Sequence, residues 1–283
     1  MSIPADTHLG PIQINVPDIS RSIQFYQQSL GLQLLDRSEK SARLGAGKPE
    51  PILMLEQNGN GRPPAGKTGL YHMAILVPSR YDLARSIRRL MEAGWPIEGY
   101  ADHGVSEAVY LSDPDGNGIE IYRDRPRLEW SYRNGQVQMV TDPIDLEGLL
   151  GELQGKDGME AGMNPDTRLG HVHLKVSSIP DAVQFYVNVL GFDLVQRFGP
   201  RAGFVSAGGY HHHIGFNTWE SDGAPPPPPG SPGLGYFTIV LPDPEALEQI
   251  IDRARQENIP VEPFGRGWQV KDPAGNAIVL MTG

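Results

Sequence analysis

A few histidines and one glutamate are the residues of this chain that could do chemistry. The chain has 283 residues, eight histidines and no cysteine. The lack of cysteine excludes disulfides, zinc–thiolate sites, iron–sulfur clusters and thiol nucleophiles. Glu120 stands between Ile119 and Ile121 in an apolar run, where an unpaired carboxylate is costly to bury. We therefore expect Glu120 to have a partner, and any metal to be held by His, Asp and Glu side chains.

Two stretches concentrate these residue types. HGVSEAVYLSDPDGNGIE at 103–120 presents His103, Tyr110 and Glu120, and YHHH at 210–213 presents three consecutive histidines. Imidazoles and carboxylates bind divalent metals, and an imidazole can take up and release a proton near neutral pH. The residue types therefore indicate a metal site with acid–base groups beside it.

Three pairs of matching segments show that the chain contains an internal duplication. GPIQINVPDISRSIQFYQQSLGL at 10–32 aligns without a gap with GHVHLKVSSIPDAVQFYVNVLGF at 170–192. GLYHMAILVP at 69–78 matches GLGYFTIVLP at 233–242, and DPDGNGIEI at 113–121 matches DPAGNAIVL at 272–280. Each half therefore holds two smaller units.

Each unit is expected to have the element order βαβββ, because a short β-rich run precedes an amphipathic helix and further β-rich runs follow. Ser20 is expected to cap the first helix. The predicted fold class is α+β, with modules at 8–57, 69–124, 169–219 and 233–283. Modules one and two make the first half, 8–124, and modules three and four the second half, 169–283. The stretch 125–168 is interpreted as the linker, and PPPPPG at 225–230 as a stiff spacer.

The repeat positions single out two histidines. His72 and His171 occupy the same place in modules two and three, where modules one and four have Pro11 and Tyr236. This recurrence favours a shared role over two unrelated structural histidines. His173 follows two residues later on the same strand face and is interpreted as a second-best ligand candidate or a supporting residue.

Glu120 has no counterpart in module four. The matching hairpin places Val279 there, so an apolar residue satisfies the packing at this position and Glu120 is there for another reason.

The four βαβββ units resemble the vicinal-oxygen-chelate superfamily, which includes glyoxalase I, fosfomycin-resistance proteins and type I extradiol ring-cleaving dioxygenases. The run from His103 to Glu120 resembles the extradiol dioxygenase signature, from which it departs at Ala101. With SAGGYHHHIGFNTW at 206–219, the whole chain is similar to the Bacillus-type catechol 2,3-dioxygenase group. The resemblance implies two half-barrel domains built from the four modules.

The resemblance also implies a metal held by His72, Glu120 and His171. Relatives take one histidine from the preceding module, but Pro11 stands at that position here. We therefore expect module two to pair with module three across the linker. Two imidazoles and a carboxylate leave open positions suited to Fe(II). Mn(II) suits the same ligands, and zinc would favour hydrolysis.

The resemblance implies that His212 is the acid–base residue, because His212 and the residues after it fit the family spacing. His213 stays a second candidate, at the place where glyoxalase-like relatives have a fourth metal ligand. The run 210–213 is expected on the last strand of module three, with His211 and His213 on the face opposite His212. Tyr110 would hydrogen-bond a substrate oxygen, and His103 would contact the substrate.

The function that follows from the resemblance is Fe(II)-dependent extradiol cleavage of catechol or a substituted catechol with O₂, with a hydroquinone substrate also open. One alternative is a glyoxalase-like lyase or isomerase that uses His72, Glu120, His171 and His213 as four ligands. Another is a protein that binds small aromatic molecules without catalysis.

The composition and the net charge limit the possible binding partners and the expected location of the protein. The net charge of −10 argues against nucleic acid and anionic membrane surfaces. No apolar run approaches the ~18 residues of a membrane span, and the N-terminus lacks an apolar signal core, so we expect a cytoplasmic protein. The oligomeric state stays open, a homo-oligomer included.

Overall fold

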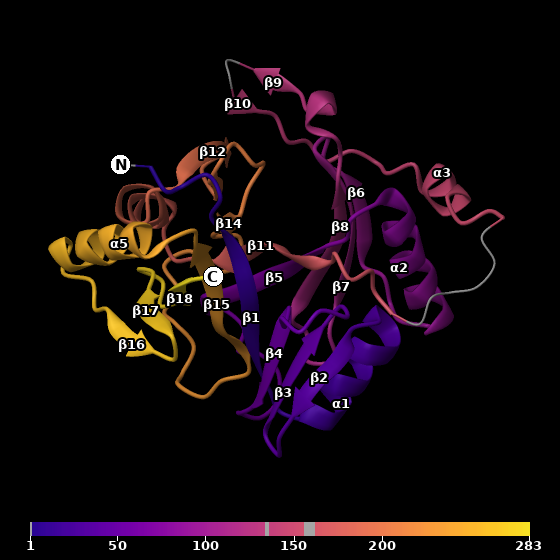
Figure 1. The fold of residues 1–283 in the computed structure, drawn as a ribbon, viewed down its shortest axis with the longest axis horizontal. Coiled ribbons are helices and arrows are strands. Elements are labelled where there is room, and N and C mark those ends of the chain that lie inside the picture. The colour runs from indigo at the N-terminus through magenta and orange to yellow at the C-terminus, as the bar shows by residue number, and fades with distance from the viewer. Residues whose placement is uncertain (1, 134–135, 156–161) are drawn as a thin grey trace.

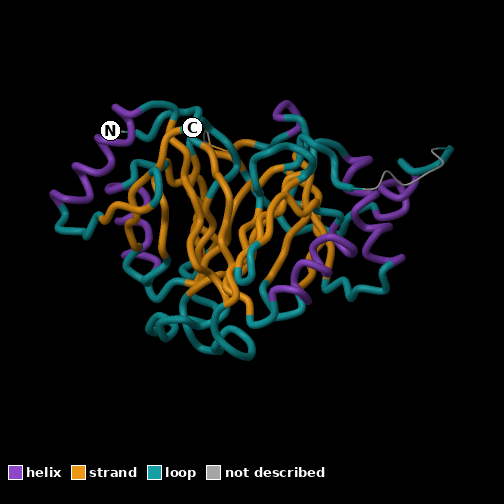
Figure 2. Tube along the Cα trace, turned by 60° about the horizontal axis from the view of Figure 1, so that its bottom comes forward, coloured by secondary structure: helices purple, strands orange, loops and turns teal. Residues whose placement is uncertain are grey.

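Two curved eight-stranded sheets form the centre of the molecule (Figure 1). This computed structural model describes residues 2–133, 136–155 and 162–283. The longer helices lie at the two outer sides of the pair of sheets (Figure 2). The predicted α+β class is therefore confirmed.

The first sheet combines the strands of modules one and four. In spatial order, these strands are β16 (Glu262–Phe264), β17 (Gly267–Lys271), β18 (Ala277–Thr282), β15 (Gly233–Leu241), β1 (His8–Val16), β4 (Leu53–Gln57), β3 (Ser41–Gly45) and β2 (Gln33–Arg37).

The second sheet combines the strands of modules two and three. In spatial order, these strands are β12 (Asp193–Phe198), β13 (Ala202–Ser206), β14 (Ile214–Asn217), β11 (Arg168–Lys175), β5 (Gly69–Leu76), β8 (Gly118–Asp124), β7 (Ser106–Ser112) and β6 (Gly99–Asp102).

Each module places one helical segment after its first strand, as the βαβββ pattern predicts. The α-helical segments are α1 (Ile19–Phe25), α2 (Arg80–Glu92), α4 (Ile179–Val183) and α5 (Pro244–Gln256). In modules one and three the helix continues as a π-helical turn, at Tyr26–Leu30 and Gln184–Val189.

The helices begin at short polar residues that satisfy free N–H groups. The side chains of Ser79, Ser178 and Asp243 each accept a hydrogen bond from the first turn of α2, α4 and α5. The predicted cap of the first helix is wrong, because Asp18 rather than Ser20 accepts from Arg21 N–H. Asp18 lies one residue before the helix, where its carboxylate can accept from the N–H of Arg21 in the first turn.

Modules two and three meet along β5 and β11, which pair antiparallel. The predicted pairing across the linker is therefore confirmed. The corresponding join in the first sheet is the antiparallel pair β1 and β15. Each sheet thus takes one module from 8–124 and one from 169–283, and the division of the chain into these two halves stays a prediction about the duplication.

The stretch between the halves is more structured than a linker. It contains a short helical turn (Arg127–Glu129), the two-stranded ribbon of β9 (Tyr132–Arg133) and β10 (Gln136–Val137), and α3 (Leu146–Gly151). Residues 134–135 and 156–161 of the predicted linker lie outside the described residues. The run 225–230 forms neither helix nor strand and connects β14 to β15. In the described ranges, no helix is long and apolar enough to cross a membrane.

Candidate metal centre and cavity

One row of residues crosses four strands of the second sheet. His171 on β11 is in register with Ala74 on β5, Ala74 with Glu120 on β8, and Glu120 with Tyr110 on β7. Residues in register share a face of the sheet. The small side chain of Ala74 leaves the space between His171 and Glu120 open.

A neighbouring row on the same face adds the second histidine. His173 on β11 is in register with His72 on β5, and His72 with Gly118 on β8. A Cβ atom on Gly118 would collide with the carbonyl oxygen of Tyr71 and lie 3.0 Å from His72 Cβ. Glycine at this position therefore keeps space beside His72.

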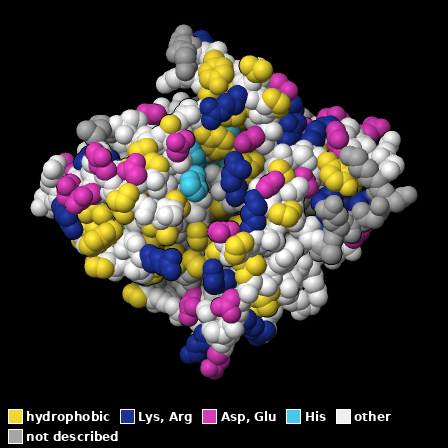
Figure 3. Space-filling model, in the orientation of Figure 1, with side chains coloured by type: hydrophobic (Ala, Val, Ile, Leu, Met, Phe, Trp, Pro, Cys, Tyr) yellow, Lys and Arg dark blue, Asp and Glu magenta, His cyan; other side chains and the backbone are white. Residues whose placement is uncertain are grey.

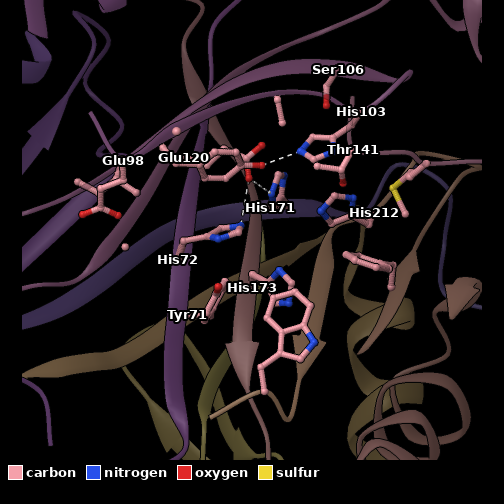
Figure 4. Close-up of a pocket in the computed structure, with 18 of the residues that line it drawn as sticks. Tyr71, His72, Glu98, His103, Ser106, Glu120, Thr141, His171, His173 and His212 are labelled. Atoms are coloured by element: carbon pink, nitrogen blue, oxygen red, sulfur yellow. Dashed lines mark hydrogen bonds and ion pairs between the residues drawn. The ribbon is translucent and has the colours of Figure 1, made fainter. Parts of the chain in front are cut away.

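The two rows bring His72, Glu120 and His171 together (Figure 4). The Nε2 atoms of His72 and His171 each lie 3.1 Å from Glu120 Oε2. All three side chains are buried, and their ligand atoms lie within 4.8 Å of one another. No second group of three such side chains with this geometry occurs in residues 2–133, 136–155 and 162–283. The expectation that Glu120 has partners is confirmed.

The electrostatics keep the carboxylate charged. Burial alone would raise the pKa of Glu120, but the adjacent His171 and His72 hold it well below its ordinary value. Burial lowers the pKa of His171 to about 4, against the opposing effect of Glu120. At neutral pH the cluster therefore contains an anionic carboxylate beside a neutral imidazole of His171.

The donor set fits a divalent metal ion. His72 Nε2 is buried and makes no hydrogen bond, although it lies close to Glu120. A buried ring nitrogen without a partner is costly, and a metal ion would use its lone pair. Imidazole nitrogens with one carboxylate suit Fe(II), Mn(II) and Zn(II) alike.

A cavity of about 630 Å³ opens over this cluster. Few histidine side chains are visible on the face of the molecule shown in Figure 3, and His72, His171 and His212 are buried. Six of the seven residues predicted for the site line the cavity. They are His72, His103, Tyr110, Glu120, His171 and His212.

His103 and Tyr110 form a hydrogen-bonded pair at one wall. His103 Nδ1 lies 2.7 Å from the Val140 carbonyl oxygen, so this nitrogen is the donor. In the neutral ring Nε2 is then the acceptor, and the Tyr110 hydroxyl donates to it over 2.7 Å. Burial and the charge of Glu120 raise the pKa of Tyr110 well above its ordinary value, which keeps the hydroxyl protonated.

His212 lies against the metal cluster. The centres of the His212 and His171 rings are 4.1 Å apart, and burial, with the neighbouring histidines, lowers the pKa of His212 well below its ordinary value. The expected location on the last strand is wrong, because residues 210–213 precede β14 in the loop from β13. The alternation argument for His211 and His213 therefore does not apply.

A second histidine and an acid fix the His212 ring. His211 Nε2 lies 2.9 Å from Asp124 Oδ1, and His211 Nδ1 lies 2.8 Å from His212 Nδ1. Because a carboxylate only accepts, His211 donates through Nε2 and, when neutral, accepts through Nδ1. His212 then donates through Nδ1, which leaves its Nε2 free to accept a proton.

Comparisons with known proteins identify the family of this chain. The sequence model of the Glyoxalase/Bleomycin resistance protein/Dioxygenase superfamily matches residues 8–121 and 168–280. A catechol-2,3-dioxygenase of Bacillus subtilis (strain 168) is 45% identical over 282 residues, which is 98% of either chain. The chain belongs to this superfamily.

More distant proteins are similar in sequence or in fold. A manganese-dependent 2,3-dihydroxybiphenyl 1,2-dioxygenase of Geobacillus genomosp. 3 is 22% identical over 97% of this chain and 84% of its own. The crystal structure of glyoxalase I from Zea mays matches the fold with a TM-score of 0.60 at 17% identity, over 97% of this chain and 92% of that one. The predicted superfamily and the predicted enzyme class, extradiol dioxygenase, are confirmed by the family match and the 45% identical relative.

His213 is the one predicted site residue of this superfamily member that lies outside the cavity. Its Nδ1 accepts a hydrogen bond of 3.2 Å from the Ala207 N–H. Its ring packs near Phe192 and Tyr210. The structure therefore does not bring His213 to the metal cluster as a fourth ligand.

The sequence reasoning missed several residues that build the site. The sequence pattern does not point to Asp124, and it does not predict that His211 contacts both Asp124 and His212. Met139, Val140 and Thr141, from the predicted linker, line the cavity. The run of three histidines is a sequence signal that could have pointed to His211. No sequence signal indicates that residues of the predicted linker line the cavity.

Proposed function

We propose that the protein is an Fe(II)-dependent extradiol dioxygenase that cleaves the ring of a catechol beside its two hydroxyl groups. Both atoms of O₂ enter the product. The observation that carries the proposal is the convergence of His72, Glu120 and His171 on one point at the base of the cavity. The 45% identity to a catechol-2,3-dioxygenase supports the reaction class.

The metal ligands come from three strands of one sheet. An Fe(II) ion bound there would supply open positions for the two catechol oxygens and for O₂. His72, Glu120 and His171 would hold the ion, and the single negative charge of Glu120 would offset part of its charge. Mn(II) is the second candidate, since it suits the same donors and one relative is named manganese-dependent.

His212 is the proposed acid–base residue. The reaction needs a proton to leave the diol and a proton to return later. Nε2 of His212 is the free acceptor, because Nδ1 donates to His211 and His211 donates to Asp124. Asp124 and His211 therefore act as positioning residues that orient His212 toward the reacting oxygens.

Tyr110 and His103 are proposed to orient the diol. Tyr110 stands in register with Glu120, so its hydroxyl lies at the edge of the metal cluster. His103 holds that hydroxyl in place and is itself fixed by Val140. A substrate hydroxyl can donate a hydrogen bond to the oxygen of Tyr110, which would hold the diol in one orientation relative to O₂.

The glyoxalase-like alternative has weaker support. It needs His213 as a fourth ligand, and His213 Nδ1 already accepts from Ala207 outside the cavity. A protein that only binds aromatic molecules has no use for a buried His–Glu–His cluster, whose assembly costs desolvation.

Oxygen uptake tests the proposal. The metal-free protein is reconstituted anaerobically with Fe(II), and in parallel with Mn(II), and mixed with a panel of catechols and hydroquinones in air-saturated buffer. We expect O₂ consumption equal to the amount of a yellow ring-opened product. No oxygen consumption with any member of the panel would contradict the dioxygenase, and turnover of a glutathione hemithioacetal would favour the lyase.

A further inference from the structure

Three aromatic side chains form one wall of the cavity, which we call the aromatic wall: Tyr71, His173 and Trp219. Their ring centres are 5.2 Å apart for Tyr71 and His173, 5.3 Å for Tyr71 and Trp219, and 5.6 Å for His173 and Trp219. The wall starts at the metal cluster, because the His173 ring centre lies 5.0 Å from that of His72.

The aromatic wall and the polar groups occupy different sides of the metal cluster. In Figure 4, Tyr71 and His173 lie on one side of His72, and His103 and Thr141 lie on the other. The polar side holds the groups assigned above to the diol. The aromatic side has no role in that assignment.

A buried amide holds the aromatic wall together. The Asn217 side chain accepts a hydrogen bond of 3.1 Å from the Trp219 N–H through Oδ1. Its Nδ2 therefore faces His173 and donates to Nε2 over 2.9 Å. Asn217 is fully buried, so one side chain fixes both the His173 ring and the backbone at Trp219.

Trp219 is 40% exposed although it is held in this way. A large aromatic side chain that lines a cavity, packs on neighbouring rings and is open to solvent is typical of a ligand contact. Lys175, which lines the cavity nearby, has Glu220 at 3.9 Å. The local charges thus offset each other, so this side of the cavity favours an uncharged group over an anionic one.

The size of the cavity exceeds what catechol needs. Cavities of roughly 300–1,000 Å³ accommodate ligands of drug size, and the volume here is about 630 Å³. Catechol has a single ring with two hydroxyl groups. A second ring or an apolar chain on that ring would reach the side of the cavity that catechol leaves empty.

We propose that the aromatic wall binds the ring substituent of the substrate, and that the preferred substrates are catechols with an aryl or extended apolar substituent. This inference rests on the proposed function. Tyr71, His173 and Trp219 offer ring faces and edges to a second aromatic ring, which packs well in edge-to-face and offset arrangements. Trp219 is the specificity-determining residue, and Asn217 positions it.

A comparison of kcat/KM between substrates tests the inference in the Fe(II)-loaded enzyme. We expect kcat/KM for 3-phenylcatechol or 4-phenylcatechol to exceed that for catechol at least tenfold. Trp219→Ala should lower the phenylcatechol value at least tenfold, mainly through KM, and change the catechol value less than threefold. Trp219→Phe should restore most of the preference. Trp268→Ala, at a partly exposed tryptophan of the first sheet, is the matched control and should change neither value.

Binding to the metal-free protein separates this inference from the proposed function. Titration with phenylcatechol should quench the tryptophan fluorescence of the wild type with a lower Kd than titration with catechol. Trp219→Phe should remove most of the quenching, because Trp219 is the fluorophore beside the ligand. Equal affinities and equal kcat/KM values for the two substrates would overturn the inference and leave the dioxygenase standing. Tight phenylcatechol binding without oxygen uptake would retain the aromatic wall as a ligand site and contradict the proposed function.

Discussion

The hydroxyl of Tyr26 in the first module donates a hydrogen bond of 2.9 Å to Asp113 in the second. Both side chains are buried. The carboxylate of Asp113 also accepts from the backbone of its own turn and from the side chain of Asn117. This one acid therefore closes the hairpin before Glu120 and ties it to the first helix.

The same arrangement recurs in the second half of the chain. Tyr186 donates to Asp272 over 2.9 Å, and Asp272 accepts from the turn up to Asn276. The repeated QFY and DPxGN sequences are the two sides of this contact. The sheets join module one to module four and module two to module three. The tyrosine–aspartate contacts join module one to module two and module three to module four.

Replacing Tyr26 by Phe should destabilise the protein. The change removes a hydrogen bond to a buried carboxylate, which is worth about 1.5–3 kcal/mol when the acceptor is charged. Equilibrium unfolding in urea measures the change in the free energy of unfolding. Tyr236→Phe is the control, since its half-buried hydroxyl has a sulfur of Met54 4.0 Å away as its contact, and we expect less than about 0.5 kcal/mol there. Equal effects of the two changes would contradict the role of the contact.

Much of the fold could be predicted because duplication leaves matching segments. The ligand pattern implied by the family resemblance needs a second histidine, and the presence of His171 with Pro11 at the alternative position predicts that module two pairs with module three. The register of β11, β5 and β8 in the paired modules brings His171, Ala74 and Glu120 into one row. The sequence of a single strand does not reveal this register.

The residues that the sequence did not reveal depend on contacts between distant segments. Asp124 ends β8 and His211 precedes β14, and they meet only after the sheet of modules two and three has formed. Val140 lines the cavity and its carbonyl oxygen accepts a hydrogen bond from His103. No local sequence pattern indicates that contact. The predicted strand position of His212 is wrong because β14 begins only at Ile214, directly after the three histidines.

Glu120→Ala should abolish metal binding. The change removes the anionic ligand and leaves two imidazoles, so we expect the Fe(II) or Mn(II) content after dialysis to fall from one per chain to background. Metal bound at 100 times its Kd stabilises a protein by about 2.7 kcal/mol, so a chelator should lower the melting temperature of the loaded wild type and leave that of the variant unchanged.

Val279→Ala is the matched control for Glu120→Ala, because Val279 takes the corresponding place in module four. It should lose some packing and keep one metal ion per chain. A variant without Glu120 that retains a full complement of metal would contradict the assignment of this carboxylate as a ligand.

His211→Phe should lower kcat about 10- to 100-fold, which is at or below the lower limit of what a positioned acid–base group itself contributes, because His211 acts through His212. The change breaks the connection from Asp124 to His212, so Nδ1 of His212 no longer has a fixed partner and the ring is free to present either nitrogen. KM for the catechol and metal content should stay within twofold of the wild type, and the pH profile of kcat should shift. A lower metal content with an unchanged kcat per metal ion would instead indicate a structural role.

Acid should destabilise the protein partly through His213. Burial lowers the pKa of His213 from its ordinary value of 6.5 to about 3, and its Nδ1 accepts from Ala207. The unfolded chain therefore binds a proton at this residue between pH 6.5 and 3 that the folded protein does not. Stability from this residue is complete above pH 6.5 and is lost as the pH falls toward 3, by about 1.4 kcal/mol per pH unit.

The comparison with His213→Asn isolates this contribution, because Asn keeps an acceptor for Ala207 and does not titrate. Between pH 7 and pH 5 the wild type should lose about 2 kcal/mol more unfolding free energy than the variant, as measured by urea unfolding at the two pH values. Parallel losses in the two proteins would mean that His213 takes up a proton in the folded state as readily as in the unfolded chain.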